Sequence, residues 1–125
     1  MKYGVLMHKI TMNLGDDIQS YALSRFYPHI DYVVDRENLD SFTSKENEPV
    51  AVIMSAWWMW QKWNWPPAAC IVPKLTSMHI NEYGIRRKAS PIKKEWFEGI
   101  GGDYFRQWGP VGCRDLTTME ILKSQ

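Results

Sequence analysis

Three side chains in this 125-residue chain are, by type and position, the candidates for moving a proton or holding an anion. Asp16 lies in a polar stretch after the first apolar run, and an aspartate there, like the neighbouring Asp17, could orient or deprotonate a hydroxyl group. His79 could carry a proton, because the ordinary pKa of histidine lies near neutral pH. Arg114 could hold a carboxylate through two parallel hydrogen bonds. We take Asp16, His79 and Arg114 as the candidate catalytic residues.

Each candidate also has a purely structural interpretation. Asp16 could do no more than cap a helix. His79 could be an ordinary histidine at the end of a strand, and Arg114 could form an ion pair with Asp115 or Asp16 that only supports the scaffold. The sequence leaves these alternatives open.

The apolar pattern predicts the elements that must position these residues. Short apolar or β-branched runs indicate five strands, separated by segments with helical periodicity. The expected strands are Tyr3–Met7, Asp31–Asp35, Val50–Met54, Leu75–Ile80 and Val111–Cys113. Strands that alternate with helices form parallel sheets with right-handed crossovers. We therefore predict one α/β domain with a five-stranded parallel sheet in the order 3-2-1-4-5 and helices on both faces.

The loop after the first strand leads into the first predicted helix. Asp16 is the expected N-cap, with Gln19 three residues later in capping-box register, and Pro28 ends the helix. Gly15 allows a sharp turn that leaves free helix N–H groups facing the region above the strand, where an anion could bind. A Gly-Asp pair is also ordinary turn chemistry without any ligand. Apolar residues that recur at helical spacing support the helix: Ile18, Tyr21, Ala22 and Phe26.

The predicted strand order brings the candidate residues together. Ligands of doubly wound sheets bind outside the carboxyl ends of the strands, where the strand order reverses. In the order 3-2-1-4-5 this reversal lies between the first and fourth strands, so Asp16, His79 and Arg114 should meet in one crevice. Neighbouring residues expected to bind substrate in this crevice are Asn13, Gly15, Asp17, Ser77 and Asn81.

Five of the seven tryptophans lie between residues 57 and 65, directly after the third predicted strand. Pro66 and Pro67 argue against one long helix, so this stretch should be an aromatic-rich loop. Exposed rings such as Trp57 and Trp58 could stack on the apolar faces of a sugar. The same rings could instead bury apolar area against another subunit or a missing domain.

Composition excludes several classes of protein. The formal charge of +1, from 15 basic and 14 acidic residues, gives no broad attraction for nucleic acid or an anionic membrane. Cys70 and Cys113 occur in unrelated contexts, which favours free thiols in a reducing compartment over a disulfide or a metal site. No apolar stretch has the length of a membrane span or of a signal-peptide core. We therefore expect a cytoplasmic protein with no metal.

With these residues placed, the sequence resembles the polysaccharide pyruvyl transferase family. Three stretches carry the resemblance: Asn-Leu-Gly-Asp-Asp-Ile-Gln-Ser at 13–20, Ser-Met-His-Ile at 77–80, and Gly-Pro-Val-Gly-Cys-Arg-Asp at 109–115 followed by a predicted helix. The Asn-x-Gly-Asp motif after the first strand is the most characteristic. The matching stretches are spread over nearly the whole chain.

The resemblance implies a transferase that moves a pyruvyl group from phosphoenolpyruvate to sugar hydroxyls as a ketal, without a further cofactor. It also implies two Rossmann-like domains that face each other across a cleft, and residues 1–125 resemble the amino-terminal one. In family members the carboxyl-terminal domain supplies basic residues that hold phosphoenolpyruvate, and no positions of this chain correspond to them. The expected partners are therefore a sugar or polysaccharide acceptor and either a second domain or further copies of the chain. The alternative is a non-catalytic module that binds a glycan or a protein through the Trp57–Trp65 loop.

Overall fold

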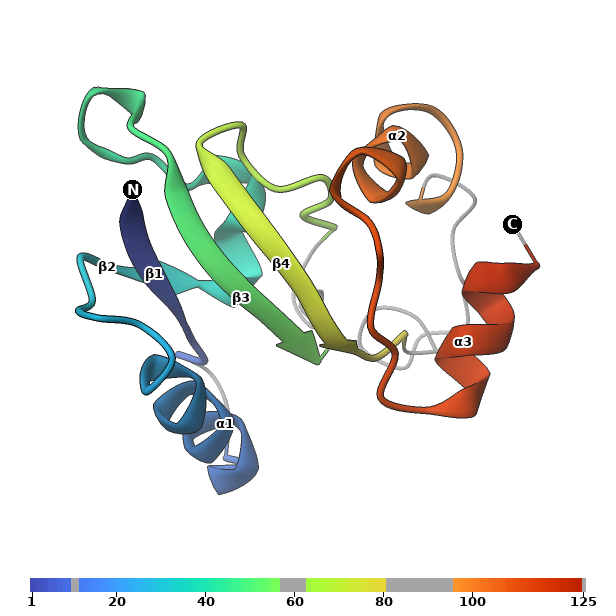
Figure 1. The fold of residues 1–125 in the computed structure, drawn as a ribbon, viewed down its shortest axis with the longest axis horizontal. Coiled ribbons are helices and arrows are strands. Elements are labelled where there is room, and N and C mark those ends of the chain that lie inside the picture. The colour runs from blue at the N-terminus through green and yellow to red at the C-terminus, as the bar shows by residue number, and fades with distance from the viewer. Residues whose placement is uncertain (10–11, 57–62, 81–95, 125) are drawn as a thin grey trace.

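The computed structural model describes residues 1–9, 12–56, 63–80 and 96–124. A parallel sheet lies at the centre, with α1 on one side of the molecule and α2 and α3 on the other (Figure 1). The strands are β1 (Lys2–Met7), β2 (Tyr32–Asp35), β3 (Val50–Ala56) and β4 (Ile71–Met78). The helices are α1 (Leu14–Ser24), α2 (Gly99–Trp108) and α3 (Leu116–Lys123), with short 3-10 turns η1 (Arg36–Ser41) and η2 (Lys45–Asn47). Within the described segments every helix is too short or too polar to cross a lipid bilayer.

The described sheet has four parallel strands in the order β2-β1-β3-β4. The predicted α/β class and parallel sheet are confirmed, but the predictions of five strands and of the order 3-2-1-4-5 are wrong. β3 pairs directly with β1, where Gly4 lies opposite Val52, and it does not lie outside β2. β3 lies inside the sheet because two neighbouring strands bury its apolar run better than one neighbour would. β2 has only four residues and an exposed Val33, so it fits the edge.

The segment expected as a fifth strand lies beside β4 without extending the sheet by a full strand. The Gly112 N–H donates to the Leu75 carbonyl at 2.9 Å, and the Met78 N–H donates to the Gly112 carbonyl at 2.7 Å. The Arg114 N–H donates to the Met78 carbonyl at 3.0 Å. Within the described residues these contacts amount to one isolated parallel bridge, between Met78 and Cys113, and not to a ladder.

The core lies on one face of the sheet and continues into an aromatic cluster that joins residues 63–65 to α2. Trp65 and Trp96 are both buried and stack with ring centroids 4.9 Å apart and planes 2° apart. Tyr104 and Phe105 of α2 pack against Trp65 at centroid distances of 5.0 and 4.7 Å. This cluster fixes α2 beside β4 through apolar area and aromatic geometry. Other large side chains that are fully buried among the described residues are Leu39, Met54, Ile71, Leu75, Met78, Ile80, Val34, Val50 and Val52.

Candidate active site

Because the four strands are parallel, their carboxyl ends share one edge of the sheet, where polar side chains gather in two groups. The first group follows β1 and β2 and consists of His8, Asp16, Arg36 and Glu37. The second follows β4 and consists of His79, Asp115 and Thr118. β3 lies between the two groups.

The first group is a buried ion-pair network. The Arg36 guanidinium donates through Nη1 to Asp16 Oδ2 and through Nε to Glu37 Oε1, both at 3.2 Å. The Arg36 side chain is only 5% exposed, so its charge depends on these two carboxylates. Asp16 is therefore tied to the turn after β2, and this contact holds the first turn of α1 against the sheet.

His8 is the buried titratable group beside this network. The residue is 8% exposed, and no described residue forms a hydrogen bond with its Nδ1 atom. Burial lowers the pKa of His8, the nearby charge of Arg36 lowers it further, and Asp16 offsets only part of this effect. His8 is therefore neutral at neutral pH. Sequence reasoning missed both His8 and Arg36; the available signal was that each follows a predicted strand directly.

The start of α1 differs from the prediction. Asn13 is the N-cap, and its side-chain oxygen accepts a hydrogen bond from the Gly15 N–H at 3.0 Å. Asp16, the predicted cap, lies inside the first turn instead. Asn is as good a cap as Asp, and a cap at Asn13 leaves the Asp16 carboxylate available for Arg36. Asp17, in the same turn, is exposed.

The second group is a histidine–aspartate pair. His79 Nδ1 lies 2.8 Å from Asp115 Oδ2, and the two side chains are 34% and 33% exposed. Asp115 is also the N-cap of α3, because its Oδ1 accepts from the Thr118 N–H at 2.7 Å. The fully buried Thr118 joins α3 to the chain that follows β4, because its hydroxyl oxygen accepts a hydrogen bond from the Ile80 N–H at 2.9 Å.

The negative charge of Asp115 determines which ring nitrogen of His79 carries a proton. Burial raises the pKa of Asp115, but hydrogen bonds from His79 and from Thr118 outweigh this effect and hold the pKa at about 2. Asp115 is therefore ionised at neutral pH and can only accept, so His79 Nδ1 must carry a proton. In the neutral imidazole, Nε2 is then the basic nitrogen, and no described residue occupies it. The pair can accept and return a proton at Nε2.

An irregularity in β4 turns the chain toward this pair. The ladder between β3 and β4 shifts register after Met54, and Ser77 adopts a left-handed backbone conformation with φ 51°. Ser77 is exposed while Met78 on its carboxyl side is fully buried. A β-bulge of this kind re-aims the side chains that follow it, here His79.

Arg114 lies beside the pair with its side chain exposed. Neither predicted scaffold ion pair of Arg114 is among the contacts of the described residues, since Asp115 binds His79 and Thr118, and Asp16 binds Arg36. The guanidinium is thus accessible to an anionic ligand at the carboxyl end of β4.

Asp16, His79 and Arg114 lie at the same edge of the sheet, but Asp16 and His79 follow strands that are not neighbours, in contrast to the predicted order. The strand order reverses between β1 and β3, not between the first and fourth predicted strands. Asp16 follows β1 and His79 follows β4, and two strand spacings of roughly 5 Å each separate these ends. Asn81, Trp57 and Trp58 lie outside the described residues.

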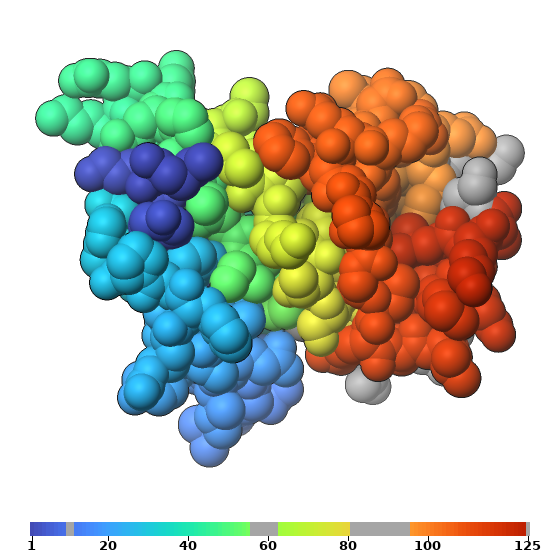
Figure 2. All heavy atoms as spheres, in the orientation of Figure 1, coloured from blue at the N-terminus to red at the C-terminus, as the bar shows by residue number. Residues whose placement is uncertain are grey.

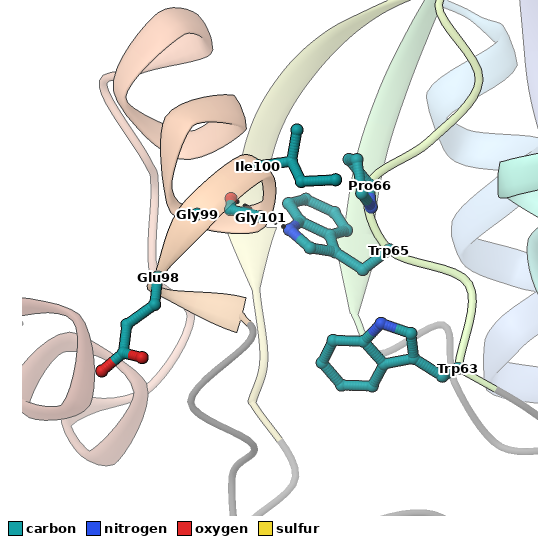
Figure 3. Close-up of a pocket in the computed structure, with 7 residues that line it drawn as sticks. All are labelled: Trp63, Trp65, Pro66, Glu98, Gly99, Ile100 and Gly101. Atoms are coloured by element: carbon teal, nitrogen blue, oxygen red, sulfur yellow. Dashed lines mark hydrogen bonds between the residues drawn. The ribbon is translucent and has the colours of Figure 1, made fainter.

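The described tryptophans belong to the core more than to a binding surface. A groove of about 530 Å³ lies between residues 63–66 and the start of α2, and Figure 3 shows the residues that line it. Trp65 forms its wall and donates through Nε1 to the Gly101 carbonyl at 3.2 Å. The Trp65 ring itself is buried, whereas Trp63 is half-buried and Ile100 is 76% exposed.

Comparison with known proteins matches this chain to no family model, no curated protein and no solved structure. Within the described residues, no cluster of histidine, cysteine, aspartate and glutamate is arranged to hold a metal ion.

Proposed function

We propose that this chain resembles the amino-terminal half of the pyruvyl transferases and that, with a second domain or subunit, it moves the pyruvyl group of phosphoenolpyruvate to a glycan as a ketal. The observation that carries this proposal is the His79–Asp115 pair, which has the geometry of a proton shuttle. The pair also joins two of the three stretches on which the family resemblance rests. These stretches pair through the backbone as well, between Met78 and Gly112 and between Arg114 and Met78.

The reaction requires two proton transfers that one histidine can perform. Protonation of the methylene carbon of phosphoenolpyruvate makes the adjacent carbon electrophilic, and a sugar hydroxyl adds there as it loses its proton. A second hydroxyl then displaces phosphate and completes the ketal, and the proton that this hydroxyl loses passes to the departing phosphate. In this proposal His79 Nε2 donates and accepts these protons, and ionised Asp115 stabilises the imidazolium that forms.

Arg114 is the proposed clamp for the carboxylate of phosphoenolpyruvate, since its exposed guanidinium can form two parallel hydrogen bonds. Asp16 receives a positioning role and not the role of base, because Arg36 already holds its carboxylate. Asn13 and Gly15 build the turn that Asp16 anchors. Further cationic groups for the phosphate would come from a second domain or a second copy of the chain.

The test is phosphate release from phosphoenolpyruvate in the presence of glycan acceptors. We expect release that requires both substrates and falls by about 100-fold or more in His79→Gln, the usual loss on removing a general acid–base group. His29→Gln is the matched control, because His29 is an exposed histidine that pairs with Asp31 before β2. Equal rates in His79→Gln and the wild type would contradict the proposed proton shuttle.

A second candidate is a non-catalytic module that binds a glycan or a protein in the groove beside Trp63. The observation that favours it is the groove itself, with a half-buried indole on one side and exposed Ile100 on the other (Figure 3). For this candidate, an oligosaccharide changes tryptophan fluorescence in the absence of phosphoenolpyruvate, and Trp63→Ala abolishes the change. Glycan-dependent phosphate release would count against it.

A further inference from the structure

Helix α1 presents its apolar side chains to solvent. Leu14, Ile18 and Tyr21 recur at helical spacing and share one face, yet they are 75%, 65% and 69% exposed. On the opposite face Asp16 and Ser20 are half-buried, and the helix packs on β1 without burying any residue fully. A helix that packs only against its own sheet has its apolar side chains on the buried face and its polar side chains on the exposed face.

Further apolar side chains are exposed next to both ends of the helix. Met12 before α1 and Phe26 after it are also exposed, at 104% and 77%. Figure 2 shows α1 projecting from the body of the molecule, on the side away from α2 and α3. Several exposed apolar side chains on and beside one helix indicate an interaction site more strongly than single exposed apolar residues do.

Two oppositely charged residues lie beside the apolar stripe, at positions where they could pair between two copies of the helix. Asp17 lies in the first turn of α1 and Arg25 is its C-cap residue, both exposed. Neither side chain forms an ion pair within the described residues. Each lies four positions from Tyr21, so two copies of α1 packed antiparallel about a two-fold axis at Tyr21 bring each Asp17 opposite the other Arg25.

We infer that the exposed face of α1 is the interface of a symmetric homodimer, with the two α1 helices antiparallel and Tyr21 at the axis. The apolar residues of the stripe meet across the axis, and the Asp17–Arg25 pairs close its two ends. This inference is independent of the proposed reaction, because it uses no residue of the His79–Asp115 pair.

The available area suits a dimer. The two exposed aromatic side chains provide on the order of 250 Å² and the three aliphatic ones a similar area, so one copy offers roughly 500 Å² of apolar surface. Two copies together bury roughly 1,000 Å² before any polar rim is counted, about the minimum for a specific interface.

The experiment is sedimentation equilibrium of the full chain at micromolar concentration. The wild type should have twice the monomer mass of 14.7 kDa. Ile18→Glu should raise the dimer dissociation constant by at least about 30-fold, because it places a charge at the centre of the interface. Leu116→Glu is the matched control, since Leu116 is also exposed but lies on α3. A monomeric wild type, or equal dissociation constants for the two variants, would overturn the inference.

A charge exchange at two exposed positions tests the antiparallel geometry. Asp17→Arg or Arg25→Asp alone should weaken the dimer by about three- to tenfold, because like charges then face each other twice. The double variant D17R/R25D should return to within about twofold of the wild type. A double variant weaker than both single variants would overturn the antiparallel arrangement.

Discussion

Asp115 caps α3 and also pairs with His79, and two substitutions at this position separate these roles. Asp115→Ala removes both the N-cap of α3 and the partner of His79. Asp115→Asn keeps a good cap, because Asn and Asp are equally effective there, but it removes the charge. We expect Asp115→Ala to lower the free energy of unfolding by about 1.5 kcal/mol, from a cap worth about 1 kcal/mol and a partly exposed pair with His79 worth about 0.5 kcal/mol. For a chain of this size that corresponds to a fall in Tm of about 5 °C.

The pH dependence of stability separates the contribution of the Asp115 charge from that of the helix cap. The folded-state pKa of Asp115 is lowered to about 2, below its ordinary value of about 4, so the ionised carboxylate stabilises the fold above that ordinary value. This contribution is lost as the pH falls from about 4 to about 2. Asp115→Asn has no such group, so the stability difference between it and the wild type should shrink over that interval.

Urea unfolding of the three proteins at a series of pH values between 6 and 2, followed by circular dichroism, measures both effects. Two results would refute the reasoning. One is an Asp115→Ala variant as stable as Asp115→Asn at pH 6. The other is a stability difference between the wild type and Asp115→Asn that stays constant down to pH 2.

Three further stability predictions use the same unfolding assay. Arg36→Met should cost about 3–5 kcal/mol, because Asp16 and Glu37 lose the buried partner of their charges; a loss below 1 kcal/mol would mean that the network is not buried in solution. Gly102→Ala should lower the free energy of unfolding by more than about 2 kcal/mol, because a β-carbon there overlaps the Phe97 carbonyl. Gly112→Ala is the control and should cost far less, because a β-carbon there makes only ordinary contacts, the nearest at 3.4 Å. Thr118→Val should cost about 1–3 kcal/mol because the Ile80 N–H loses its buried acceptor, and Thr118→Ser should recover most of that loss; equal stability of the Val and Ser variants would contradict the hydrogen bond.

The sequence was informative where burial and chemistry act locally. The β-branched and apolar runs predicted the four parallel strands, because such runs pack well on a buried sheet. His79 was identified as a candidate, and its partner Asp115 lies in the stretch named for the family resemblance.

The strand order was predicted wrongly because the choice followed connectivity and not burial. The run Val50–Met54 requires cover on both sides, which places β3 inside the sheet and leaves the short β2 at the edge. The order 3-2-1-4-5 would have put the most apolar strand outermost.

Periodicity also has an inherent limit, which α1 illustrates. The spacing of Ile18 and Tyr21 shows that they share a helix face, but it does not say which face meets the sheet. In the structure that face is exposed. His8 and Arg36 escaped notice for a different reason: a single residue that follows a strand forms no motif, and only the fold places it beside Asp16.

The most direct test of the proposed site is to titrate the ¹⁵N-labelled chain with phosphoenolpyruvate and follow the backbone amide shifts. If the reaction site lies at the carboxyl end of β4, the largest shifts occur at His79, Arg114 and Asp115, and they disappear in Arg114→Gln. Shifts confined to Trp63 and the start of α2, or no shifts at millimolar phosphoenolpyruvate, would contradict the proposed site.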